Sequence, residues 1–153
     1  MQQYKEDLKQ ALRHIQIADH ITYVTFPLVN EKRLLLKIIE EINLAIICSL
    51  NCMFNYKYPL KNVDFNKDNL DLLESSLKEI SKDYELTNEQ IIKIKEIFEL
   101  NQKHKKSSIE FVKKDNVVIL SDNLSFQAIN IQKIKEYLLL AKRIIIKFNL
   151  KIK

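Results

Sequence analysis

Hydrophobic positions recur along much of the chain at alternating spacings of three and four residues, the pattern of a helix with one buried side. The first such stretch runs from about Gln3 to Thr25 and predicts a long amphipathic helix. Pro27 follows and is expected to interrupt the helix, because proline offers no N–H group for a helical hydrogen bond. The inward positions predicted for this helix are Tyr4, Leu8, Ala11, Ile15, Ala18 and Thr22.

The same pattern predicts a second helix from Asn30 to about Tyr56, with Asn30 as its N-terminal cap and Glu31 in its first turn. Between Leu44 and Phe54 the sequence is apolar on nearly every side, so we expect this helix to be the central one. Its main inward stripe is Leu35, Ile38, Ile42, Ala45, Ser49, Met53 and Tyr56.

Three further helices are predicted in the rest of the chain. One follows a loop around Pro59 and carries its inward residues at Leu70, Leu73, Leu77 and Ile80. The next begins at a capping box, in which the side chains of Thr87 and Gln90 satisfy each other's backbone donors. The last runs from about Asn130 to Lys151.

The segment near residues 107–129 is the least regular, and only Val117–Leu120 fits an extended strand. The chain contains no glycine, which argues against tight hairpins because their turns usually need residues with positive φ. The sequence therefore predicts an all-α fold. We expect a single antiparallel helical bundle of four long helices plus one shorter helix, with one irregular segment.

The composition fits one domain spanning residues 1–153, because 46% hydrophobic and 29% charged residues are typical of folded domains. The opening residues are polar, and the longest apolar run is shorter than the ~20 residues of a membrane helix. We therefore expect a cytoplasmic protein without a membrane segment. Cys48 and Cys52 are expected to be buried thiols, and neither a metal nor a cofactor is predicted. The missing glycines exclude a phosphate-binding loop.

Charge is distributed unevenly along the chain. Residues 103–153 carry twelve basic and four acidic residues, whereas residues 61–102 carry six basic and ten acidic ones. The basic region is either a solvated surface or a contact for nucleic-acid phosphates. Phe111 is the only aromatic residue among these lysines, so the sequence does not predict a stacking platform for bases. The residues predicted for an RNA contact are Lys103, Lys105, Lys106, Lys113 and Lys114.

The stretch RHIQIADH, residues 13–20, concentrates side chains of catalytic type. Arg13 and His20 are seven residues apart and therefore lie on nearly the same line of the helix. His14 is about a third of a turn away from His20, which argues against metal binding by the two histidines. Asp19 falls beside the inward stripe, where a carboxylate needs a partner. The candidates on other helices are Arg33, Asn43 and Arg143.

A second apolar line on the first helix consists of Ile17, Ile21, Val24 and Leu28. It lies opposite the main inward stripe, and Arg13 and His20 flank it. An apolar line of this kind predicts a contact with another helix or another chain. We therefore expect a homodimer, or a complex with a small protein partner, through this surface.

The opening helix, YKEDLKQALRHIQIADHITYV, followed by a long apolar second helix, resembles the HEPN superfamily of small helical bundles. These proteins are typically dimeric and often act on RNA, and their catalytic members carry arginine, four to six residues, and then histidine. The resemblance implies a metal-independent ribonuclease site at a dimer cleft, in which Arg13 holds a phosphate and His20 assists attack by the ribose 2′-hydroxyl. In catalytic members the motif normally lies in later helices, whereas here it lies in the first. The chain is also similar overall to small helical archaeal proteins, a likeness that implies no activity.

Two functions of different classes follow from these patterns. The first is a non-catalytic helical interaction module that associates with itself through the first helix, with RNA as a further candidate partner. The alternative is the HEPN-like ribonuclease with Arg13 and His20 as its catalytic pair. The remaining polar groups are interpreted structurally: Glu40 and Glu41 as a helix-surface pair pointing in different directions, and His104 as a surface histidine at a helix end.

Overall fold

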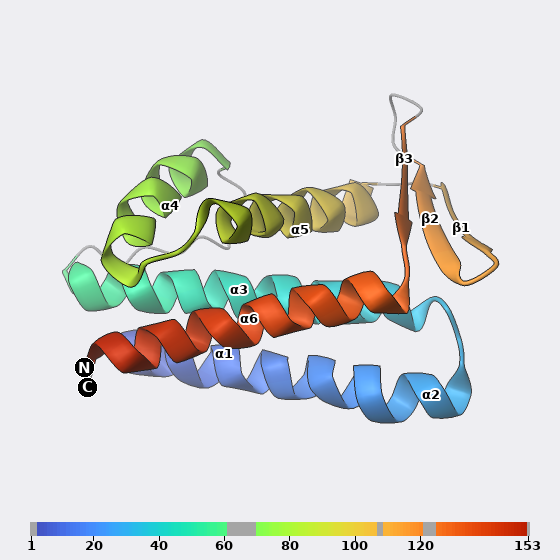
Figure 1. The fold of residues 1–153 in the computed structure, drawn as a ribbon, viewed down its shortest axis with the longest axis horizontal. Coiled ribbons are helices and arrows are strands. Elements are labelled where there is room, and N and C mark those ends of the chain that lie inside the picture. Colours follow the sequence, from blue (N-terminus) through green and yellow to red (C-terminus); the bar gives the residue numbers. More distant parts are fainter. Residues whose placement is uncertain (1–2, 61–69, 107–108, 121–124, 153) are drawn as a thin grey trace.

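The computed structural model of the protein describes residues 3–60, 70–106, 109–120 and 125–152, without the side chains of residues 70–74. Long helices form the body of the molecule, and a small sheet lies at the end away from the two chain termini (Figure 1). The long helices are α1 (Gln3–His20), α3 (Leu34–Lys57), α5 (Asn88–Lys106) and α6 (Ile131–Ile152), and the shorter helix is α4 (Leu70–Tyr84).

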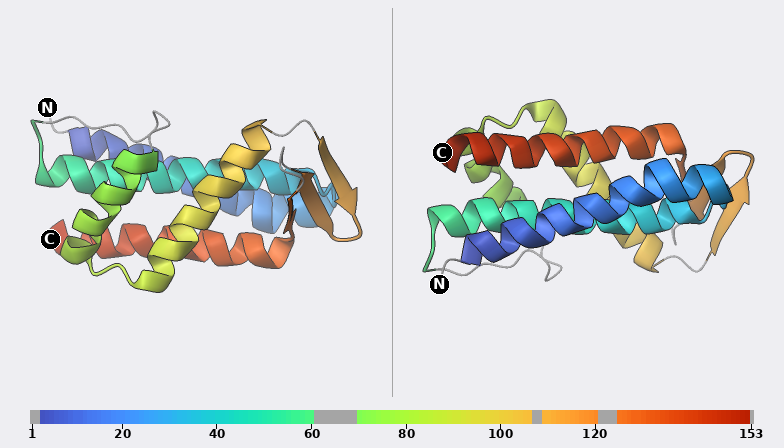
Figure 2. Two further views of the ribbon diagram at one scale, coloured as in Figure 1. Left: turned by 90° about the horizontal axis from the view of Figure 1, so that it is seen from above. Right: turned by 90° about the horizontal axis from the view of Figure 1, so that it is seen from below.

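Helix α3 is the central element, as its apolar sequence predicts. It packs against α1, α4, α5 and α6. Helices α3 and α6 run in one direction while α1 and α5 run in the other, and α5 crosses α3 obliquely (Figures 1 and 2). The predicted inward stripe of α3 is buried except for Tyr56, which is 40% exposed. The side chains of Leu70 and Leu73 and residues 61–69, which include most of the loop predicted around Pro59, lie outside the described part of the chain.

The first helix is confirmed in its inward positions but does not stop at the proline. Ala11, Ile15, Ala18 and Thr22 are buried. A π-helical segment, η1 (Ile21–Thr25), follows α1, and Pro27 lies in the first turn of the short helix α2 (Phe26–Val29). Proline needs no N–H partner in a first turn, and the wider π turn shifts the hydrogen-bond register just before it. The predicted interruption at Pro27 is therefore wrong.

The predicted cap of the second long helix is also wrong. Asn30 ends α2 in the left-handed conformation, with φ of 53°, and α3 begins at Leu34. Asparagine tolerates this conformation better than most residues do, so it suits a helix C-terminus as well as an N-terminus. The predicted capping box is confirmed, because the side chains of Thr87 and Gln90 each accept a hydrogen bond from the other residue's backbone N–H. The structure adds a cap that was not predicted: the side chain of Asn130 accepts a hydrogen bond from the Lys133 backbone N–H at the start of α6.

The segment predicted as irregular contains a three-stranded antiparallel sheet, so the fold is mostly helical but not all-α. Its strands are β1 (Ile109–Lys113), β2 (Asn116–Leu120) and β3 (Phe126–Ile129), in the order β1-β2-β3. Strands β1 and β2 are joined by the two-residue turn Lys114–Asp115, because Lys113 pairs with Asn116. Lys114 takes the positive φ, 56°, that glycine usually supplies, so the absence of glycine did not prevent the hairpin.

The two faces of the sheet have different surroundings. The inner face contributes Val117, Ile119 and Ile129, all with no exposed surface, to the same core as the helices. The outer face carries Ile109, Phe111 and Phe126, which are exposed. The cross-strand pairing places these two sets on opposite sides, because neighbouring residues along a strand alternate in direction.

Candidate functional site

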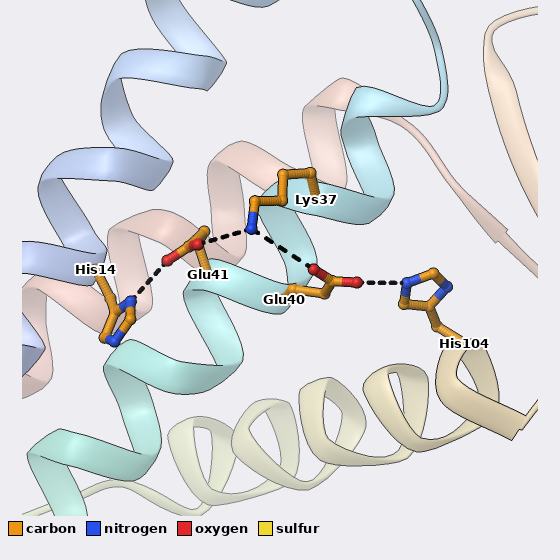
Figure 3. A network of polar contacts seen from close by, with 5 residues as sticks. All are labelled: His14, Lys37, Glu40, Glu41 and His104. Carbon is orange, nitrogen blue, oxygen red and sulfur yellow. Dashed lines mark hydrogen bonds and ion pairs between the residues drawn. The ribbon is translucent and has the colours of Figure 1, made fainter.

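The most concentrated polar chemistry lies where α3, α5 and β1 meet. His104, near the end of α5, lies between two carboxylates: its Nε2 is 2.8 Å from Glu40 Oε1 of α3, and its Nδ1 is 2.6 Å from Glu110 Oε2 of β1. Figure 3 shows His104 reaching across to Glu40 from the neighbouring helix. Glu110 reaches His104 because it alternates with the outward-facing Ile109 and Phe111, and so points to the inner face of the sheet.

The geometry of His104 has a consequence for its protonation. A neutral imidazole has one N–H donor, so it can donate to only one of two carboxylates, whereas the imidazolium donates to both. Burial disfavours the charged ring, but the hydrogen bonds to Glu110 and Glu40 outweigh burial and raise the pKa of His104 above its ordinary value. In its imidazolium form, His104 therefore clamps α3 to the sheet through two charged hydrogen bonds.

A second histidine and carboxylate continue this network towards α1. His14 Nδ1 lies 2.6 Å from Oε2 of Glu41, which is only 5% exposed, and Lys37 Nζ lies 3.1 Å from the other oxygen of Glu41 (Figure 3). Burial would raise the pKa of Glu41, but the contacts with His14 and Lys37 hold it below its ordinary value. Lys37 also lies 3.8 Å from Glu40, so the network runs from α1 through α3 to α5 and β1.

This network was not predicted from the sequence. Glu40 and Glu41 do point in different directions, but they are not a surface pair, since Glu41 is buried against α1 and Glu40 reaches α5. His104 is not a simple surface histidine, because its side chain is 16% exposed and paired on both sides. No group of three histidine, cysteine or carboxylate side chains among the described residues is placed to hold a metal. The network therefore fits a structural clamp that positions the sheet.

The predicted pair Arg13 and His20 lies on the exposed side of α1. His20 Nδ1 is 3.5 Å from the hydroxyl of Thr25, in the π-helical segment that follows. The neighbouring Asp19 has a partner on another helix, as predicted, but this partner is Lys142 of α6, at 2.5 Å, and none of the three proposed residues. Both side chains of the pair are therefore open to a ligand or to a second protein.

The predicted dimer line is only partly exposed. Val24 and Leu28 are 45% and 82% exposed, whereas Ile21 is partly buried and packs against the core, and Ile17 is also partly buried. The π-helical segment begins at Ile21. Because its turn is wider than an α-helical turn, the side chains that follow it point in a different direction from those that precede it. The exposed apolar surface here is thus centred on η1 and α2 rather than on α1.

The structure gathers the predicted lysines at the sheet end of the molecule in two groups. Lys103, Lys105 and Lys106 lie in the last turn of α5, and Lys103 is the least exposed of them. Lys113 and Lys114 lie at the β1–β2 turn and are exposed. Strand β1 separates the two groups, and its five residues span about 13 Å.

Two cations that the sequence analysis did not assign to this surface lie beside the hairpin. Lys32 Nζ is 3.8 Å from Asp115 at the turn, and Arg33 donates to the backbone carbonyl of Glu110 at 3.4 Å. Both belong to the segment between α2 and α3, far from the basic final third in sequence. Only the folded chain brings these charges next to Lys113 and Lys114.

A surface hollow of about 280 Å³ borders the free edge of β3. Glu96 and Glu99 of α5 and Tyr137 of α6 line it, and the Tyr137 hydroxyl donates to Glu96 at 3.1 Å. This hollow contains neither Arg13 nor His20. Cys52 is buried as predicted, whereas Cys48 is only partly buried. The Cys52 thiol donates to the carbonyl of Tyr4, and burial raises its pKa, which disfavours the reactive thiolate.

In comparisons with known proteins, no family model, no curated protein and no solved structure matches the chain. Within the described residues, none of the helices has the length and apolar character required to cross a membrane. The function must therefore be inferred from the surfaces themselves.

Proposed function

We propose that this protein is a non-catalytic interaction module that binds RNA with the sheet end of the molecule. The observation that carries the proposal is that exposed lysines lie at both ends of one edge strand: Lys105 and Lys106 precede β1, Lys113 is its last residue and Lys114 follows directly. Paired cations separated by an extended strand can contact successive phosphates of a chain without reading its sequence.

The local acidic groups do not cancel this charge. Glu40 and Glu110 are both engaged by His104 on the inner side of the sheet, and Asp115 at the turn lies near Lys32. Arg33 adds a further guanidinium close to β1. Glu96 and Glu99 line the hollow beside Phe126 together with Lys133, so the exposed cations are concentrated around β1 and its turn rather than over the whole sheet end. This concentration favours an anionic partner at β1.

The test is a charge-matched pair of variants measured for RNA binding by fluorescence anisotropy over a range of salt. Replacing Lys105, Lys106, Lys113 and Lys114 together with Gln should weaken binding for all sequences alike. The slope of the logarithm of the binding constant against the logarithm of salt concentration should also become shallower. For a single strand, it should change by about 0.7 for each phosphate contact that is lost. The control replaces exposed lysines elsewhere, Lys5, Lys9, Lys78 and Lys82, and changes net charge equally.

The control variant should keep the salt dependence of the wild type, because its lysines lie on α1 and α4. An equal loss in both variants would mean that net charge alone attracts RNA, which contradicts a defined site. Failure of the unaltered protein to bind any RNA at low salt would remove RNA from the account.

A second candidate function keeps the Arg13–His20 pair and is favoured by the exposure of both side chains on one line of α1. In this alternative, a second copy brings its own pair to a shared cleft, using the exposed Val24 and Leu28. Cleavage of RNA that disappears in His20→Ala, together with a dimer that dissociates in Leu28→Asp, would support the ribonuclease. Binding without any cleavage supports the passive module.

A further inference from the structure

The outer face of the sheet is apolar across all of its strands. Residues that pair directly across an antiparallel sheet point to the same side, so the register defines this face in rows. The first row is Ile109, Leu120 and Phe126. The second row is Phe111, Val118 and Ala128. The third row, Lys113 and Asn116, is polar and adjoins the turn.

This face is open in the structure. Ile109, Phe111 and Phe126 are 49%, 37% and 65% exposed. Val118, at the centre, is 8% exposed but does not belong to the core that the helices share. An antiparallel sheet with one solvated face usually carries polar residues there, so six apolar side chains on this face require another explanation.

Two of the exposed side chains are aromatic and come from different edges of the sheet. Phe111 lies on β1 and pairs with Val118, whereas Phe126 lies on β3 and pairs with Leu120, so β2 separates the two rings and they stand in neighbouring rows. The sequence shows only Phe111 near the lysines, because Phe126 reaches this face through the pairing of β3 with β2. The folded chain therefore has two exposed rings on one face, with Lys105 and Lys106 before one end of β1 and Lys113 and Lys114 at the other end.

We propose that this outer face binds single-stranded RNA, with unpaired bases stacked on Phe111 and Phe126 and phosphates held by the flanking lysines. The inference rests on the proposed function and adds the class of RNA. In a duplex the bases stack on one another inside the helix, so an aromatic ring on a protein surface cannot stack on them. Every unpaired base of a single strand, in contrast, offers a flat face for stacking. The charge at both ends of the strand favours a polyanion over an uncharged apolar partner.

The experiment compares one mixed-sequence RNA as a single strand and as a duplex with its complement, binding to the full chain. The wild type should prefer the single strand. Phe111→Ala combined with Phe126→Ala should weaken single-strand binding by roughly 5- to 150-fold per ring, while duplex binding should not change. The matched control is Leu150→Ala, a side chain that is 72% exposed near the other end of the molecule, which should leave both affinities unchanged.

A second variant separates stacking from apolar contact. Phe111→Leu combined with Phe126→Leu keeps the face apolar but removes both rings, and circular dichroism confirms that each variant is folded. Single-strand affinity that falls in the leucine variant as in the alanine variant supports stacking. A leucine variant with the single-strand affinity of the wild type would overturn stacking on the two rings.

The failures of the two proposals can be told apart. Equal binding of single strand and duplex, with no effect of the phenylalanine variants, would overturn this inference and leave RNA binding through the lysines intact. No binding of either RNA would overturn both. Self-association that is lost in the phenylalanine variants, with RNA affinity unchanged, would assign the outer face to protein contact instead and contradict the inference.

Discussion

The two faces of the small sheet are both apolar, but only one of them is covered. On the inner face, Val117, Ile119 and Ile129 have no exposed surface and share the core of the helices. On the outer face, Phe111 and Phe126 keep 37% and 65% of their surface exposed. Burial against the helices explains the composition of the inner face. No described element covers the outer one, and we propose that its apolar composition serves binding.

The largest expected effect is a difference in the free energy of unfolding between a variant of the inner face and a variant of the outer face. Ile119→Ala removes buried methyl groups from the inner face and should lower the free energy of unfolding by about 2–5 kcal/mol. Phe126→Ala removes an exposed ring from the outer face and should change the free energy of unfolding by less than about 0.5 kcal/mol. Denaturant titrations of both variants measure the difference. Losses of unfolding free energy of similar size in the two variants would show that the outer face is packed as well as the inner one, which would contradict the difference between the two faces.

A smaller effect concerns the clamp that holds the inner face in place. In His104→Gln the charged hydrogen bonds to Glu40 and Glu110 are lost, which should cost about 1.5–3 kcal/mol at pH 5.5. Since the folded pKa of His104 is raised, its contribution is fully present below the unfolded value of about 6.5 and is lost as pH rises through the folded value.

The measurement is the difference in unfolding free energy between the wild type and His104→Gln as a function of pH. That difference should shrink as pH rises above neutrality. At pH 5.5 the control His20→Gln, on the exposed side of α1, should stay within about 0.5 kcal/mol of the wild type. A difference that grows with pH would contradict the charged clamp.

The smallest effect lies at the turn between β1 and β2. Lys114→Gly should raise the free energy of unfolding by up to about 1 kcal/mol, because its positive φ of 56° strains a side chain that has a Cβ atom. Lys113→Gly removes the same charge from a residue paired in β1, and should lower the free energy by about 0.5–1 kcal/mol. Equal effects of the two glycines in thermal melts would show that charge, rather than backbone conformation, determines the result.

Sequence patterns predicted the helices well because each helix carries its own evidence. The inward residues of α1 and α3 follow the helical period, and the capping box at Thr87 is a local signal. Pro27 and Asn30 were misassigned because a π-helical turn and a left-handed C-terminal residue change the usual meaning of both residue types. Val117–Leu120 was identified as extended, but its partner strands were not.

The sheet and its surroundings depend on contacts between distant residues, which periodicity does not reveal. The run of apolar residues in β2 resembles a strand covered on both faces, and the sequence alone cannot tell which face the helices cover. Glu40 lies 64 residues before its partner His104, so their pairing had no local signal. Phe126 likewise joins Phe111 only through the register of three strands. The lysines could be proposed as candidates from the sequence, whereas the face with two exposed rings could not.

The most direct test of the central claim is to follow backbone amide signals by nuclear magnetic resonance while a short single-stranded RNA is added. The account predicts that the signals of β1, of β3 and of the last turn of α5 shift together and saturably. Signals of the exposed side of α1, including Arg13 and His20, should not shift. Shifts confined to residues 13–28 would contradict it, and so would shifts of the β3 signals around Phe126 that the duplex form of the same RNA reproduces.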